Sequence, residues 1–186
     1  MASVPSDLWL LQSFLDSIDM ETAGDDLESL PRFRRWLSAH DRVSAAKAAT
    51  AADLEVAREL RRGLRSVLNA HAVGTSVAVA DAAALDQLAR RVPLAVGVAL
   101  DGTPVLRPGA GGGAGVLGEV LVAAVTAAVD GRWARLRLCA NDECSVVFYD
   151  QSRNASRRWC DMGVCGNRMK LRAYRARHRS GAEVDQ

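Results

Sequence analysis

Four thiols in the last third of this 186-residue chain are the side chains best suited to chemistry. They are all of its cysteines and form two pairs, Cys139 with Cys144 and Cys160 with Cys165. Structural zinc sites are tetrahedral and closed, and their ligands often come as two pairs on separate turns. A tight loop can form each pair here, and the gap between the pairs leaves room for a strand and a turn. The spacing Cys-x4-Cys-x15-Cys-x4-Cys therefore predicts one structural Zn²⁺ ion.

An iron–sulfur cluster and paired disulfides stay open as alternatives, because the four-residue gap inside each pair is wider than the commoner gap in zinc sites. The N-terminal residues lack the basic patch and apolar run of a secretory signal. The most apolar stretch, residues 116–129, carries Glu119 and is shorter than the about 20 residues that cross a bilayer. We therefore expect a cytoplasmic protein with no membrane partner. In that reducing compartment, cysteines serve as metal ligands more often than as disulfides.

Charge is distributed unevenly along the chain. Residues 1–131 carry 12 Arg and Lys against 16 Asp and Glu, a net charge of −4, whereas residues 132–179 carry 12 against 4, a net charge of +8. Four thiolates around one Zn²⁺ would reduce the net charge of residues 132–179 by two and leave a strongly positive surface. A clustered basic segment suits a polyanion such as DNA. The alternative is that the arginines keep a small unit soluble.

The basic residues fall in two groups around the second cysteine pair. One group forms a stripe at spacings of four, three and four on the last expected helix, which we place from about Cys165 or Gly166 to His178. The candidate nucleic-acid contacts are Arg153, Arg157, Arg158, Arg168, Lys170, Arg172, Arg175 and Arg179. Arginine matches phosphate geometry, and in a major groove it can also reach guanine. Alternatively, this face is solvated or contacts the acidic N-terminal half.

The elements that precede the cysteines are mainly helical. Apolar residues at helical spacing predict helices that begin after Asp7, near Pro31, and over residues 51–70 and 81–91. Asp7 is the expected N-cap of the first of these helices. In the helix over residues 51–70, Gly63 marks a close packing contact. Four arginines of this helix are expected to lie largely outside its apolar stripe: Arg58, Arg61, Arg62 and Arg65.

The pattern then changes to strands. Residues 94–100 and 105–106 predict a hairpin that turns at Asp101-Gly102. Residues 109–115 predict a flexible glycine-rich loop, and residues 116–129 a buried helix that Asp130-Gly131 ends. Two short strands at 136–138 and 146–149 flank the first cysteine pair. The fold class is therefore α+β and mainly helical, with a helical N-terminal domain (1–131) and a C-terminal unit (132–186) of two strands and a helix.

The residues around the cysteines resemble the CGNR zinc-finger family. The likeness rests on Cys139-Ala-Asn-Asp-Glu-Cys144, on Val147-Phe148-Tyr149-Asp150, on Arg158-Trp159-Cys160-Asp161-Met162, and on the tetrapeptide Cys165-Gly166-Asn167-Arg168 that gives the family its name. Members pair this finger with an N-terminal domain called ABATE. A looser likeness to that domain rests on Leu15-Asp16 and on residues 30–37. The resemblance implies a treble-clef-like zinc finger and a stress-induced transcription regulator.

Local geometry gives the residues around the metal their expected roles. Cys165 at a helix start places the positive end of the helix near the thiolates. Gly166 allows close approach, and Trp159 is expected to pack over the site, joined by Phe148 and Met162. Asn167 and Arg168 either tie the loops together or contact a ligand, and backbone N–H groups are expected to donate to the sulfurs.

Other motifs carry little chemistry. Gly113 to Gly118 satisfies G-x-G-x-x-G, but it lacks the preceding strand and the later acidic residue of a dinucleotide site. The three histidines, His40, His71 and His178, are expected on the surface or at helix ends. Asp25, Asp26 and Glu28 form an acidic cluster expected to be a solvated turn. No nucleophile–base constellation is visible, so an enzyme is not expected.

The sequence thus predicts a transcription regulator whose C-terminal unit binds DNA and whose N-terminal domain senses a signal or mediates assembly. Two alternatives from other classes stay open. One is an adaptor whose basic helix docks on an acidic protein partner, and the other is a small-molecule sensor with a pocket among the N-terminal helices. The sequence leaves the oligomeric state open, a homodimer included.

Overall fold

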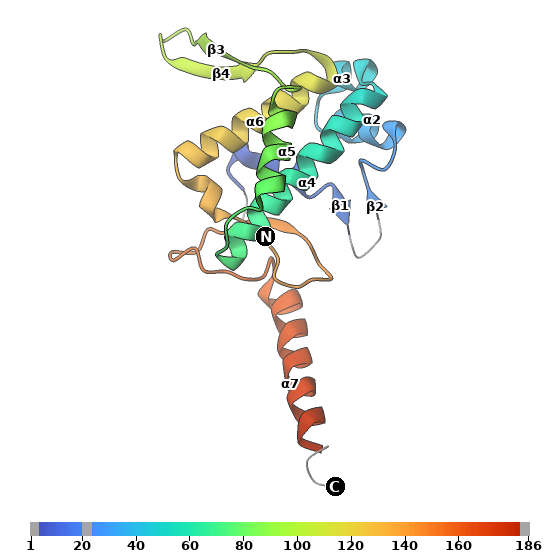
Figure 1. The fold of residues 1–186 in the computed structure, drawn as a ribbon, viewed down its shortest axis with the longest axis vertical. Helices are drawn as coiled ribbons and strands as arrows, with labels where there is room; N and C mark the ends of the chain where they lie inside the picture. The colour runs from blue at the N-terminus through green and yellow to red at the C-terminus, as the bar shows by residue number, and fades with distance from the viewer. Residues whose placement is uncertain (1–3, 20–23, 183–186) are drawn as a thin grey trace.

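The computed structural model describes residues 4–19 and 24–182 of the chain, apart from the side chains of Asp19 and of residues 179–182. Helices form a central body, with a β-hairpin at one end and a long C-terminal helix, α7 (Asn167–Ala182), projecting from the other. The loops that carry the cysteines lie between the body and α7 (Figure 1). The architecture is the expected one, a mainly helical N-terminal region with a hairpin and a C-terminal hairpin followed by a helix.

The chain begins with a 3₁₀ turn, η1 (Ser6–Leu8), and a short helix, α1 (Trp9–Leu15). The prediction that Asp7 caps this helix is wrong, because Asp7 lies inside the 3₁₀ turn and pairs with Arg132 at 2.7 Å. Ile18 is also outside the helix. It belongs to β1 (Ile18–Asp19), which pairs antiparallel with β2 (Gly24–Asp25).

The middle helices have well-formed starts. Ser29 caps α2 (Leu30–Ala39), with Pro31 in its first turn as expected, and α3 (Val43–Ala48) follows. Thr50 and Asp53 form a reciprocal capping box at the start of α4 (Ala51–Val73), the longest helix. α5 (Val79–Ala89) then packs back against α4.

Gly63 of α4 provides the close contact with α5, as predicted. A methyl group at Gly63 would overlap the Leu85 side chain of α5. Replacing glycine by alanine favours a helix by roughly 1 kcal/mol, but overpacking costs about 1–3 kcal/mol. We therefore expect Gly63→Ala to destabilise the protein by about 1 kcal/mol in urea unfolding. In a Leu85→Ala background the same change should stabilise, and a stabilising effect in both backgrounds would contradict the contact.

The glycine-rich segment is more helical than predicted. The hairpin of β3 (Leu94–Val98) and β4 (Pro104–Pro108) turns at Asp101-Gly102 as expected, with Gly102 at φ 85°. The helix α6 (Gly112–Val129), however, starts inside the segment predicted to be a flexible loop. Side chains at Gly113, Gly115 and Gly118 would collide with neighbours, the last with Pro108. These glycines therefore permit close helix packing and are not a flexible linker.

α6 is long and apolar enough by length and composition to cross a membrane. Its buried side chains, including Leu117 and Val120, instead belong to the main core, where α6 packs against α1, α3 and α4. Gly131, at φ 81°, adopts the left-handed conformation directly after the C-cap of α6, Asp130. The helix therefore ends at Asp130-Gly131, as expected. α6 is therefore a core helix of the folded body.

The C-terminal unit shares this core. The 3₁₀ turn η2 (Arg132–Arg135) leads into β5 (Leu136–Leu138), which pairs antiparallel with β6 (Val147–Tyr149). Leu136 and Val147 are almost completely buried in the same cluster as the N-terminal helices. The hairpin is therefore anchored in the helical body, while the segment beyond it depends on the cysteines.

Candidate metal centre

Short structural elements place all four thiols together. Cys139 directly follows β5 and Cys144 lies three residues before β6, so the first pair sits at the turn of this hairpin. Cys160 is in the loop after β6. Cys165 lies in a π-helical turn, η3 (Met162–Gly166), immediately before α7. The order of hairpin and then helix is treble-clef-like.

The thiol geometry fits a single zinc ion. All four Sγ atoms lie within 4.8 Å of one another, with Cys144–Cys160 at 3.6 Å and Cys160–Cys165 at 3.7 Å. In a tetrahedral site with Zn–S bonds of about 2.3 Å, the sulfurs are about 3.8 Å apart. Three of the cysteines are buried and Cys160 is half-buried. The four cysteines thus form one closed, structural zinc site.

Protons compete with the metal for these thiols. Burial raises the pKa of the Cys144 thiol to about 11 and also raises the pKa of Cys160. Burial alone would raise the pKa of Cys165 as well, but a hydrogen bond from Asn141 and contacts with the other thiols lower it. Zinc binds the thiolate, so its binding must release protons. Zinc affinity is therefore expected to fall as the pH falls.

Asn141, inside the first cysteine loop, supports the site from within. It is completely buried, and its Nδ2 lies 3.7 Å from Cys165 Sγ, across the site. Its Oδ1 accepts from the Glu143 N–H, and its carbonyl accepts from the Cys144 N–H. No role was predicted for Asn141 from the sequence, although a short polar side chain between two predicted zinc ligands is a signal that could have indicated one.

Asp150, for which no role was predicted from the sequence, organises the loop between the cysteine pairs. Its fully buried carboxylate accepts from the backbone N–H groups of Ser152 and Arg157 at 2.8 Å. Burial alone would raise the pKa of Asp150, but these bonds lower it. The carboxylate therefore closes the loop that returns the chain to Cys160.

Most of the predicted packing around the metal is present. Trp159 packs against the cysteine cluster, and a side chain at Gly166 would collide with Trp159 and with Met162. Asn167 donates to the Gly163 carbonyl, so it ties the second loop together. Phe148 is buried outside the cysteine cluster, and Met162 is 52% exposed, so the expectation that both join this small core is not met.

Three of the predicted nucleic-acid contacts have structural roles. Arg172 pairs with Asp142 at 3.3 Å and with Glu143, which fastens α7 to the first cysteine loop. Arg157 donates to the Cys160 carbonyl at 2.6 Å and lies over the Phe148 ring. Arg158 lies over the Trp159 ring, 5.2 Å from its centroid.

The other predicted contacts differ in exposure. Arg153, Lys170 and Arg175 are exposed, and none has an ion pair or hydrogen bond within the described residues. Arg168 is half-buried and has a polar or electrostatic partner. The side chain of Arg179 lies outside the described residues. The exposed cations on α7 therefore lie on more than one face, since Lys170 and Arg175 are five residues apart.

Three polar side chains of the helical body form hydrogen bonds with the backbone of the β5–β6 hairpin. Gln12 donates to the Val147 carbonyl at 3.1 Å, and Asp16 accepts from the Val147 N–H at 2.9 Å. Arg65 donates to the Leu15 carbonyl and to that of Ser145, next to the ligand Cys144. The body and the metal site are therefore joined by specific hydrogen bonds as well as by a shared core.

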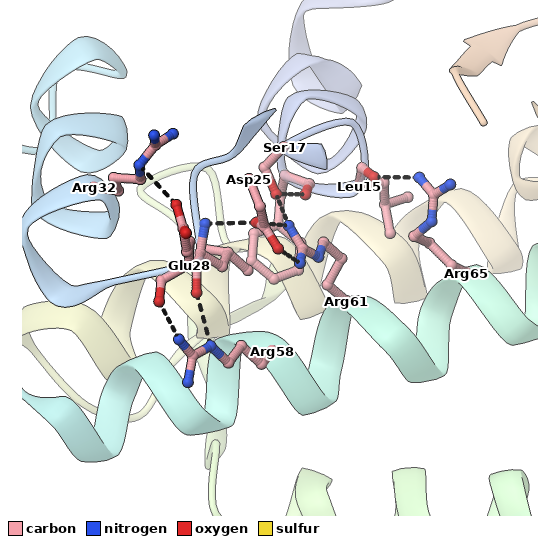
Figure 2. Close-up of polar contacts among 10 residues, drawn as sticks. Leu15, Ser17, Asp25, Glu28, Arg32, Arg58, Arg61 and Arg65 are labelled. Carbon is pink, nitrogen blue, oxygen red and sulfur yellow. Dashed lines mark hydrogen bonds and ion pairs between the residues drawn. The ribbon is translucent and has the colours of Figure 1, made fainter. Parts of the chain in front are cut away.

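The arginines of α4 also anchor the acidic cluster (Figure 2). Arg61 is 8% exposed and forms a two-pronged ion pair with Asp25, at 2.6 and 2.7 Å. Arg58 donates to the carbonyls of Leu27 and Glu28. The expectation of a solvated acidic turn is therefore wrong at Asp25, and Arg61, expected outside the apolar stripe of α4, is buried in this ion pair.

The three histidines also differ in environment. His40 caps the C-terminal end of α2 as a helix-end residue, but it is buried, 9% exposed. His71 is exposed in the last turn of α4, and His178 is exposed on α7, where it contacts the Tyr174 ring. The buried His40 lines a cavity beside α1 and α2.

Fold and site together define a class of protein, a helical domain joined to a treble-clef-like zinc finger of four cysteines. Comparison with protein families finds two matches. Residues 135–178 match the CGNR zinc finger, and residues 10–135 match ABATE, the family described as "Putative stress-induced transcription regulator". The ABATE match covers more than half of the chain, so the chain belongs to that family. No curated protein matches it. The family description indicates a regulatory rather than a catalytic role.

Proposed function

We propose that the protein binds duplex DNA through the C-terminal unit, with α7 as the contacting helix. The observation that supports this most is the position of α7, which packs on the turn that holds Cys165 and projects away from the helical body (Figure 1). Lys170 and Arg175 on this helix are exposed. A projecting helix of this kind fits a major groove, where its cations can contact phosphates or guanine.

The structural arginines support the same proposal in another way. Arg172 holds α7 on the loop of Asp142 and Glu143, so the zinc site fixes the direction in which the helix projects. Arg157 donates to the Trp159 carbonyl, and Arg158 lies over the Trp159 ring. We therefore divide the basic residues into those that position the helix and those that contact DNA.

A protein adaptor is the second candidate. The acidic residues of the N-terminal half that the structure describes do not cover Lys170 or Arg175, which leaves this surface available to an acidic partner as well as to DNA. Leu171 and Tyr174 on the same helix are each 55% exposed, and apolar groups of this kind also suit a protein partner. A steep dependence on salt for duplex binding distinguishes the two.

We further propose that residues 1–131 and 132–186 act as a regulatory and a binding domain, and that the protein works in the cytoplasm. The shared core at Leu136 and Val147 supports coupling between the two parts. The ABATE and CGNR matches meet at residue 135, which is close to this boundary.

A salt titration of duplex binding tests the DNA proposal. For the zinc-loaded protein we expect the affinity to fall steeply as salt rises, because arginine and lysine displace counterions. Arg175→Ala should lower the salt slope by about 1 and weaken binding to all duplexes alike. Arg172→Ala should weaken binding more, because it also frees α7 from the cysteine loop. Arg90→Ala, an exposed arginine of the N-terminal half, is the matched control. Absence of binding at low salt, or equal binding by Arg175→Ala, would contradict the proposal.

A further inference from the structure

A cavity of about 310 Å³ lies beside α1 and α2, away from the cysteines. Two indoles and an imidazole form its aromatic wall: Trp9, 48% exposed, Trp36, 4% exposed, and His40. Its other lining side chains are polar and include Gln12, Asp16 and Asp26. Binding pockets commonly combine aromatic walls with a few placed polar groups, and this volume is at their lower limit.

The aromatic wall is rigid because His40 contacts two indole rings and forms hydrogen bonds through both of its ring nitrogens. Its ring lies between two indoles, with centroids 4.1 Å from Trp36 and 4.8 Å from Trp9. Nδ1 donates to the Trp36 carbonyl at 2.6 Å, because a carbonyl only accepts. Nε2 forms a hydrogen bond with the Ser13 hydroxyl at 2.5 Å. With both ring nitrogens bonded to residues of α1 and α2, His40 is a fixed part of the wall.

The polar side of the cavity offers acceptors. Asp26 is exposed, and its carboxylate has no partner within the described residues. Gln12 Oε1 is a buried acceptor for which the described chain supplies no donor. Asp16 adds a second carboxylate, and no lysine or arginine of the described chain lines the cavity. Carboxylates beside indole faces favour a positively charged occupant that donates hydrogen bonds.

The cavity does not gather a set of metal-ligating side chains from the part of the chain that the structure describes. Among the described residues, the four cysteines are the sole group of three or more metal-ligating side chains close enough to share an ion. Asp16, Asp26 and His40 therefore do not form a second such group. We propose that this cavity binds a small organic cation, an ammonium or guanidinium compound.

The position of the cavity connects such a ligand to the zinc site. Gln12 and Asp16 line the cavity, and the same two side chains hold the backbone of Val147. Val147 begins β6, two residues after the backbone carbonyl of Ser145 that Arg65 binds. A cation that contacts Asp16 or Gln12 alters their hydrogen bonds to β6. Ligand binding in the helical body is thereby coupled to the cysteine loop.

Titration of the full-length, zinc-loaded protein with matched probes tests this inference without DNA. Phenethylamine and agmatine are the cationic probes, and phenylacetate is an anion of similar size. Calorimetry and quenching of indole fluorescence should show saturable binding of a cation and none of phenylacetate. Asp26→Asn should weaken cation binding about fivefold, and Trp9→Ala about tenfold. Asp101→Asn, at the exposed turn between β3 and β4, should leave it unchanged.

The outcomes separate the two steps of the inference. If neither cation saturates, or if phenylacetate binds as tightly, the cavity is not an organic-cation site. The rate of zinc transfer to a chelator measures the coupling, and saturating cation should change this rate in the wild type. An unchanged rate, despite binding, would overturn the coupling. Failure of DNA binding alone would affect neither result.

Discussion

Cys165→Ser is expected to abolish stoichiometric zinc binding and to unfold the segment between β6 and α7. Cys165 is 2% exposed and stands at the junction of the cysteine loops with α7. The small cluster around the metal consists of the cysteines, Val146 and Trp159, which is too little apolar surface to fold alone. Zinc contributes an apparent ~10–16 kcal/mol in small zinc peptides. Without it, the loops have no other source of comparable stability.

The helical body should survive this change, because Leu136 and Val147 remain anchored among the N-terminal helices. We therefore expect zinc content near zero by elemental analysis, rapid proteolysis after Tyr149, and retention of most helical circular dichroism. Val164→Ala, at a neighbouring side chain that is 53% exposed, is the matched control and should keep its zinc. A Cys165→Ser protein with one zinc per chain and a protected C-terminal unit would refute the tetrathiolate site.

The zinc site was predictable because its information is local. The two cysteine pairs, the strands beside the first pair and the helix after Cys165 all lie within a short segment with its own turn and strand signals. Local signals also predicted the turn at Gly102 and the packing of Gly63. At such positions the neighbouring residues in the chain dictate the conformation.

The supporting contacts could not be predicted because they join distant segments. The bond between Asp16 and Val147 spans 131 residues, and that between Arg65 and Ser145 spans 80. An arginine at helical spacing with others suggests a solvated face, yet tertiary packing buries Arg61. Likewise, glycines at the start of α6 suggest a loop until their tight contacts are known. Periodicity gives the face of a helix, but it does not show which polar side chains find buried partners.

Arg61→Ala is expected to destabilise the helical body by about 3 kcal/mol, because it leaves the partly buried Asp25 without its cation. The Arg61 side chain is 10% exposed and that of Asp25 is 29% exposed, so the loss is at the lower end of the range for buried pairs. Arg61 also donates to the Ser17 hydroxyl, which loses this donor. Urea unfolding followed by circular dichroism measures the change. Arg62→Ala, at the next and exposed arginine, should change stability by no more than about 0.5 kcal/mol.

The pH dependence identifies the ion pair as the cause. Burial alone would raise the pKa of Asp25, but the bonds from Arg61 and from the Leu27 N–H lower it below its ordinary value of 3.8. A lowered pKa contributes stability above that ordinary value and loses it as the pH falls through the pKa of the folded state. The difference between wild type and Arg61→Ala should therefore be complete at neutral pH and shrink below pH 3.8. A difference that stays constant into acid would mean that lost packing, not the ion pair, destabilises the variant.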